Sequence, residues 1–207
     1  MFEFIEKIVY INLNERTDRR EAVEAELLRV FPAEKIERFA AIRTSMGGIG
    51  CGLSHIGVLE RAKAAGWANV LVVEDDLAWN NEKLAEANAA YHKILETHPG
   101  EWDVILLSAT FANCTPGGRV RSAQSAMCYL VNSTYYDTLL ATLKEGVENL
   151  IRTSDWKTYA NDQYWKRLQA RDRWWLVLPM ACYQRPDFSN IEGKAVDYRR
   201  YFFAEVK

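Results

Sequence analysis

Three adjacent acidic residues, Glu74, Asp75 and Asp76, form the part of the sequence with the most distinctive chemistry. They directly follow residues 70–73, an apolar run typical of a strand that is buried on both faces. Adjacent carboxylates repel one another unless a cation binds, and hard oxygen ligands suit Mn²⁺ or Mg²⁺. Strand alternation places Glu74 and Asp76 on one side and Asp75 on the other. We therefore predict a divalent-metal site at Glu74, Asp75 and Asp76, with a solvated, helix-capping turn as the alternative.

The elements that must position this acidic block alternate between strands and helices. Strands are predicted at residues 8–13, 38–42, 70–73, 104–107, 126–131 and 174–178. Helices are predicted at 19–30, 54–65, 82–96, 134–143 and 155–170, with a flexible glycine-rich loop at 47–52. This order predicts one α/β domain over residues 1–207, with a central, mainly parallel sheet flanked by helices. Ligands bind such sheets at the carboxyl ends of the strands, where the acidic block lies.

The composition and the distribution of residues along the chain limit the classes of protein to which it can belong. The 207 residues suffice for one hydrophobic core, and the net charge of −2 gives no sign of a nucleic-acid partner. The N-terminus lacks a signal-peptide pattern, and no apolar stretch of about 20 residues is present. The four cysteines have no zinc-like spacing and fit a reducing compartment, so we expect a cytoplasmic protein.

Four short motifs occur in order along the chain. They are Tyr10-Ile11-Asn12-Leu13 with Arg16, Arg19 and Arg20; Gly50-Cys51-Gly52-Leu53-Ser54-His55; Glu74-Asp75-Asp76; and Gln184-x-Pro186 with Ser189-Asn190-Ile191. Together they span residues 8–191 and resemble the motifs of glycosyltransferase family 25. Two positions depart from that pattern. Asn190 stands where the family commonly has Asp, and no histidine follows His98 to complete a metal site.

The resemblance implies a function as well as a fold. It implies a GT-A-like, Rossmann-like fold and a metal-dependent, inverting hexosyltransferase. The expected donor is a UDP-sugar, with UDP-galactose the family's commonest choice. The expected acceptor is a saccharide or glycolipid hydroxyl, as in the lipopolysaccharide-building members of the family.

The resemblance also implies a donor-binding set. Its members are Asn12, Arg16, Arg19, Gly50, Ser54, His55, Glu74, Asp75, Gln184 and Ser189. Arg43 is a further candidate for the same pocket, because it lies just after the second predicted strand. Arginine pairs with phosphate, and glycine-rich backbone at a helix N-terminus lets N–H groups approach an anion. The alternatives are arginines that solvate a helix end and a His55 that is a satisfied helix residue. Cys51 is expected to be a small packing residue.

An inverting transfer needs a general base that takes the proton of the acceptor hydroxyl. Asp162, in a polar run beside aromatic residues, is the first candidate, and Asp155 is the second. Either acid could instead cap a helix or lie on the surface.

Residues 198–203 mix cations with aromatic side chains. They could contact the inner face of a membrane peripherally or dock onto the domain itself.

Two functions other than glycosyl transfer remain open for the protein. One is a metal-dependent phosphohydrolase, which is disfavoured because Asn12 and Asn14 stand where an early acidic nucleophile would be expected. The other is a non-catalytic, carbohydrate-binding relic of the same fold.

Overall fold

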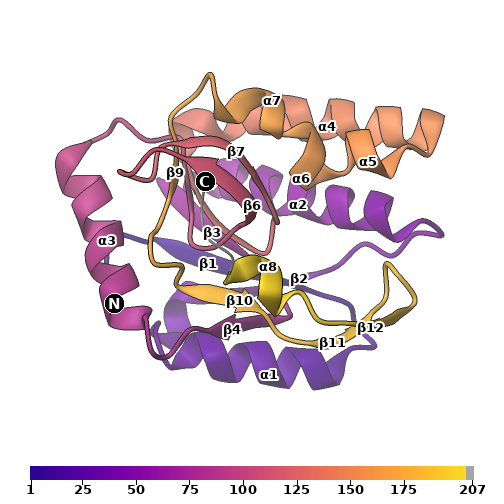
Figure 1. The fold of residues 1–207 in the computed structure, drawn as a ribbon. Helices are drawn as coiled ribbons and strands as arrows, with labels where there is room; N and C mark the ends of the chain where they lie inside the picture. Colours follow the sequence, from indigo (N-terminus) through magenta and orange to yellow (C-terminus); the bar gives the residue numbers. More distant parts are fainter. Residues whose placement is uncertain (204–207) are drawn as a thin grey trace.

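A six-stranded sheet lies at the centre of residues 1–203, the part of the chain that the computed structural model describes (Figure 1). Its strand order is β2-β1-β3-β8-β5-β9. The strands are β1 (Lys7–Asn12), β2 (Ile36–Ala40), β3 (Asn69–Glu74), β5 (Val104–Leu106), β8 (Cys128–Asn132) and β9 (Trp174–Leu176). Only β8 runs antiparallel to its neighbours. The predicted α/β fold with a mainly parallel sheet is therefore confirmed.

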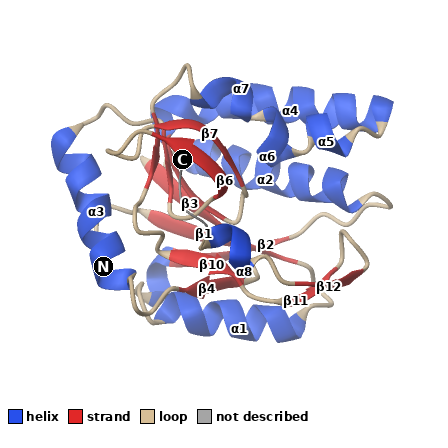
Figure 2. Ribbon diagram, viewed as in Figure 1, coloured by secondary structure: helices blue, strands red, loops and turns tan. Residues whose placement is uncertain are grey.

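Helices cover both faces of this sheet. The long helices are α1 (Thr17–Leu28), α2 (Gly47–Ala65), α3 (Leu84–Thr97) and α4 (Tyr136–Thr153). Helix α1 lies on one face, and α2 lies on the other with α4 packed against it (Figures 1 and 2). The β1-α1-β2 and β2-α2-β3 connections step in opposite directions along the sheet. Right-handed crossovers then require α1 and α2 to lie on opposite faces.

The apolar sequence of the central strands reflects their burial in the sheet. Residues Val70–Val73 of β3 are completely inaccessible to solvent. Each buried valine or leucine side chain stabilises the fold by roughly 1.5–3 kcal/mol relative to an exposed one. The chain becomes polar only at Glu74, where β3 ends, so the apolar sheet delivers the acidic block to its carboxyl edge.

Three antiparallel ribbons, which the sequence did not predict, flank the sheet. They pair β4 (Leu77–Trp79) with β10 (Cys182–Gln184), β6 (Thr110–Cys114) with β7 (Val120–Gln124), and β11 (Asp187–Ser189) with β12 (Lys194–Val196). The β4–β10 pair sets Gln184 opposite Leu77. The ribbon therefore brings the C-terminal part of the chain to the acidic block. We call residues 187–196, which contain β11 and β12, the C-terminal hairpin.

The predicted loop at residues 47–52 is wrong, because these residues form the first turns of α2. Glycine disfavours helix by about 1 kcal/mol relative to alanine, but close packing overrides this preference. A Cβ atom on Gly50 would lie 2.3 Å from the carbonyl oxygen of Ile42, and one on Gly52 would lie 2.6 Å from the Val147 side chain. Glycine lets α2 approach both neighbours.

The continuous helix predicted at residues 155–170 is also wrong. Three short helices occupy this segment: α5 (Trp156–Tyr159), α6 (Asn161–Tyr164) and α7 (Lys166–Gln169). The extended backbone of Ala160, with ψ near 148°, separates α5 from α6. This bend accompanies the full burial of Trp165, whose ring packs edge-on against Tyr129 with ring centroids 5.2 Å apart.

Candidate active site

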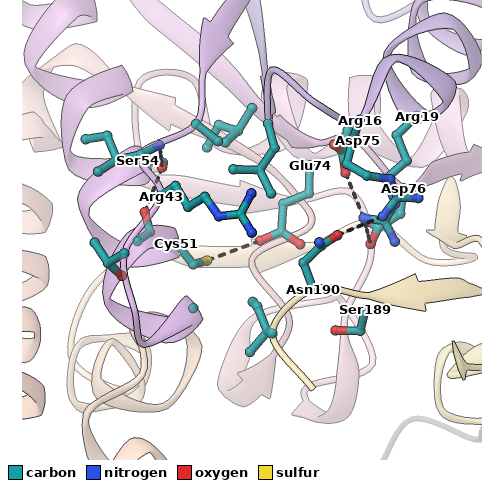
Figure 3. A pocket seen from close by; sticks show the side chains of 18 of the residues that line it. Arg16, Arg19, Arg43, Cys51, Ser54, Glu74, Asp75, Asp76, Ser189 and Asn190 are labelled. Carbon is teal, nitrogen blue, oxygen red and sulfur yellow. Dashed lines mark hydrogen bonds and ion pairs between the residues drawn. The ribbon is translucent and has the colours of Figure 1, made fainter. Parts of the chain in front are cut away.

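A cavity of about 470 Å³ opens at the carboxyl ends of β1, β2 and β3. Its lining combines residues that follow these three strands with the first turns of α2 and the C-terminal hairpin (Figure 3). The predicted site residues that line it are Arg16, Arg19, Arg43, Gly50, Ser54, His55, Glu74, Asp75, Asp76, Gln184 and Ser189. Asn12, Asp155 and Asp162 are not part of this lining.

The acidic block divides between two environments. Arg19 Nη1 donates to Asp75 Oδ1 at 2.8 Å and to Asp76 Oδ2 at 3.3 Å. Glu74 instead lies beside His55, with 3.2 Å between Glu74 Oε1 and His55 Nε2. The expected placement of Asp75 and Asp76 on opposite sides of a strand is wrong. Strand β3 ends at Glu74, so the two aspartates lie in a turn where strand alternation no longer applies.

Asp76 is the most deeply buried carboxylate of the block. Burial, with the nearby charge of Glu74, raises the pKa of Asp76 to about 7. Gln184 Nε2 donates to its Oδ2 at 2.8 Å. Its Oδ1 has no hydrogen-bond partner among the described residues. A buried, unpartnered oxygen beside other carboxylates is a suitable ligand for a hard divalent cation.

Asn12 lies behind the cavity and holds Asp75 in place. Its amide nitrogen donates to Asp75 Oδ2 at 2.7 Å, and its oxygen accepts from Arg38 Nε at 3.1 Å. Burial raises the pKa of the Asp75 carboxyl, and the Arg19 charge opposes this rise. Arg38, on β2, was not predicted as part of the site.

Asp187, at the start of β11, is the main residue that sequence reasoning missed. Its Oδ2 accepts from Arg16 Nη2 at 2.7 Å and from Arg19 Nε at 2.8 Å. Burial alone would raise the pKa of Asp187, but hydrogen bonds from Arg19, the Phe188 N–H and Arg16 lower it overall. Arg16 Nη1 also donates to Asn190 Oδ1 at 2.8 Å. These contacts fasten the C-terminal hairpin across one side of the cavity.

Three other predicted donor-binding groups have partners within the protein. The Ser54 hydroxyl accepts from the Ile42 N–H at 2.8 Å and donates to the Gly50 carbonyl at 2.7 Å. It therefore fastens α2 to the chain after β2. Ser189 Oγ accepts from the Glu192 N–H at 3.2 Å inside the C-terminal hairpin. Arg43 is exposed and forms an ion pair with Glu15 at the cavity edge.

His55 is buried, and both of its ring nitrogens have partners. Nδ1 lies 2.8 Å from the Tyr129 hydroxyl, opposite the Nε2 contact with Glu74. Cys51, one turn earlier on α2, has its Sγ 3.7 Å from Glu74 Oε1. Within residues 1–203, Cys51, His55 and Glu74 are the set of three potential metal-binding side chains whose ligand atoms lie within 4.8 Å of one another.

The two candidate bases differ in their environments. Asp162 Oδ2 accepts from the Ser125 N–H at 3.0 Å, and burial raises the pKa of its carboxyl, with Glu74 adding to the rise. Its neighbour Asn161 contacts Cys51 Sγ at 3.6 Å, so α6 adjoins the metal-binding set. Asp155 is exposed, and its Oδ1 caps α5 by accepting from the Thr158 N–H at 3.3 Å.

Comparisons with known proteins extend this description. No protein-family model and no curated protein sequence matches the chain significantly. Solved structures do match, among them a glycosyltransferase involved in glycosylation of the major capsid of PBCV-1. The identity is 10%, with 82% of this chain and 79% of that chain covered and a TM-score of 0.53. The chain has a fold found in glycosyltransferases.

A second such structure is the glycosyltransferase GlyE of Streptococcus pneumoniae TIGR4, at 11% identity and a TM-score of 0.51. The match covers 84% of this chain and 45% of GlyE, so the chain spans less than half of that protein. At such identities the likeness is one of fold. The similarity to family 25 therefore continues to depend on the sequence motifs.

The C-terminal segment docks onto this fold, as one of the two sequence interpretations expected. Phe202 of α8 (Arg199–Phe202) is buried, and the Tyr201 ring packs against Phe111 with ring centroids 4.8 Å apart. Among the described helices, none has both the length and the apolar character needed to cross a bilayer.

Proposed function

We propose that this protein is a metal-dependent, inverting glycosyltransferase of the family 25 type. It transfers a hexose, with galactose from UDP-galactose as the first choice, to a hydroxyl of a saccharide or glycolipid. The observation that carries the proposal is the cavity at the carboxyl ends of β1–β3, which is lined by both the acidic block and arginines. It lies in a fold that resembles that of a glycosyltransferase. A cytoplasmic role in building lipopolysaccharide-type glycans is the matching biological setting.

The donor diphosphate binds in this proposal between the arginines and the start of α2. Arg16, Arg19 and Arg43 line the cavity and can pair with phosphate oxygens. The first turn of α2 contains no acidic residue, and the dipole of this helix favours an anion at its N-terminus. The cavity volume of about 470 Å³ lies within the usual range for small-molecule sites.

The acidic block would hold Mn²⁺ or Mg²⁺, and the unpartnered Oδ1 of Asp76 is the atom that best fits such a cation. When bound, the cation neutralises charge on the leaving diphosphate. Arg19 keeps Asp75 and Asp76 together, and Gln184 orients Asp76. Asp162 accepts the proton of the acceptor hydroxyl, a role that its raised pKa favours.

The decisive experiment measures release of UDP from a panel of UDP-sugars, with and without Mn²⁺, in wild type and in Asp76→Asn. We expect metal-dependent release from one donor, and at least about a 100-fold loss in the variant, because the cation contributes several kcal/mol of charge stabilisation. Asp18→Asn is the matched control. Asp76 pairs with Arg19, and Asp18 is an exposed acid that pairs with the neighbouring Arg16 but lies outside the cavity lining.

Other outcomes would select the other functions. Turnover of simple phosphate esters without a sugar donor would indicate a phosphohydrolase. Donor binding without turnover under any metal, unchanged in Asp76→Asn, would indicate a non-catalytic relic.

A further inference from the structure

Cys51 and His55 present two different ligand atoms to the same carboxylate. They lie four residues apart on α2, so both side chains project from one helix face. Glu74 meets them from the end of β3, and Figure 3 shows the contact between Cys51 and Glu74 at the cavity wall. All three residues line the cavity.

The spacing of these atoms suits a tetrahedral zinc ion. With bonds of about 2.3 Å to sulfur and about 2.0 Å to nitrogen and oxygen, tetrahedral angles place sulfur about 3.5 Å and nitrogen about 3.3 Å from the carboxylate oxygen. The observed separations from Glu74 Oε1 are 3.7 Å for Cys51 Sγ and 3.2 Å for His55 Nε2. All three ligand atoms lie within 4.8 Å of one another, which is close to the arrangement that a bound ion requires.

A second layer of contacts already orients the three ligands. The Tyr129 hydroxyl lies 2.8 Å from His55 Nδ1, and the Tyr129 side chain is fully buried. Because a hydroxyl can donate or accept, Tyr129 can hold the tautomer that leaves the Nε2 lone pair free for a metal. Asn161 Nδ2 donates to Cys51 Sγ at 3.6 Å from the other side.

The ligand types decide which ion fits. A thiolate, an imidazole and one carboxylate favour Zn²⁺, or its substitute Co²⁺, over Mn²⁺ and Mg²⁺, which prefer all-oxygen sites. We propose that Cys51, His55 and Glu74 form a zinc site whose fourth position opens into the cavity for water or a substrate oxygen. It shares only Glu74 with the acidic block that would hold Mn²⁺ or Mg²⁺, and it does not depend on the transferase proposal.

The test titrates the metal-free full-length protein with Co²⁺ and follows the sulfur-to-cobalt charge-transfer absorption, then displaces Co²⁺ with Zn²⁺ to obtain the zinc affinity. We expect one equivalent to bind with this absorption. Cys51→Ser should lose the absorption and at least about 100-fold in zinc affinity, because even outer-shell partners contribute 10- to 100-fold. Tyr129→Phe, which removes only the hydroxyl, should keep the absorption and weaken zinc binding by about 10- to 100-fold.

Cys114→Ser is the control, because it removes a different free thiol, a buried one on β6 outside the cavity lining. It should retain the wild-type absorption and affinity, and circular dichroism of each metal-free variant checks that the fold is intact. Absence of the charge-transfer band in wild type, or its survival in Cys51→Ser, would overturn the proposal. Since no sugar donor is present, neither result bears on whether the protein is a transferase.

Discussion

At the scale of single residues, Arg19 organises the charges of the site. Its guanidinium contacts the carboxylates of Asp75, Asp76 and Asp187, and only 11% of its side chain is exposed. Removing one partner from such a buried ion-pair network leaves uncompensated charge, which typically costs about 3–5 kcal/mol. Arg19 is therefore a structural centre of the cavity as well as a candidate phosphate ligand.

The proposed role of Asp162 as general base makes a prediction at this scale. Asp162→Asn should lower kcat by about 100- to 10,000-fold and leave the KM for the donor near the wild-type value. Because burial raises the pKa of Asp162, its basic form accumulates at higher pH than that of an exposed aspartate. The rate should therefore rise with pH through this pKa in wild type, and the acidic limb should disappear in the variant.

Asp155→Asn is the control for this measurement, because Asp155 is exposed and caps α5. It should leave the pH–rate profile unchanged. Loss of the acidic limb in Asp155→Asn, with a normal profile in Asp162→Asn, would assign the base to Asp155.

At the scale of elements, the position of α2 depends on close packing at Gly50. Gly50→Ala should destabilise the protein by about 1–3 kcal/mol, because a Cβ atom would lie 2.3 Å from the Ile42 carbonyl oxygen. Gly48→Ala is the matched control in the same helix, since its Cβ would make an ordinary contact of 3.6 Å with Leu150. It should be neutral or stabilising by up to about 1 kcal/mol. Urea unfolding measures both, and equal effects would contradict the packing argument.

The C-terminal hairpin makes a second prediction at this scale. Asp187→Asn removes its ion pairs with Arg16 and Arg19, so trypsin should cleave after Lys194 faster than in wild type. Asp197→Asn, which loses a pair only with the exposed Arg199, should leave the cleavage rate unchanged. Equal cleavage of wild type and Asp187→Asn would show that the ion pairs do not hold the hairpin.

The same contact determines how the hairpin responds to pH. The folded pKa of Asp187 is lowered, so its contribution is present above the ordinary aspartate pKa of about 4. That contribution is lost as the pH falls through the lower, folded value. The hairpin should therefore stay docked at neutral pH.

At the scale of the whole molecule, one continuous core joins the two ends of the described chain. Buried residues from Phe2 to Phe202 belong to it, and the Phe2 ring packs edge-on against Tyr91 with ring centroids 5.2 Å apart. We predict a single cooperative unfolding transition, with equal calorimetric and van't Hoff enthalpies. Leu71→Ala should lower the midpoint temperature without dividing the transition, at a cost of about 2–5 kcal/mol. Two separate transitions in calorimetry would contradict a single domain.

The sequence alone determined the features that neighbouring residues encode. The apolar run at 70–73 predicted the central strand, and the abrupt change at Glu74 predicted a polar strand end at the cavity. Alternating patterns predicted the mainly parallel sheet and the order of its flanking helices. These predictions succeeded because strand and helix periodicity and burial are local properties of the chain.

Tertiary structure alone decided which of these residues meet. Arg19 and Asp187 lie 168 residues apart, and no local pattern links them. The glycines at 47–52 read as a loop because their helical role depends on Ile42 and Val147, which approach from other parts of the chain. Cys51 and His55 share a helix face through their local i, i+4 spacing, but only the packing of β3 against α2 brings Glu74 to them. Such contacts depend on how elements pack, which local sequence patterns do not record.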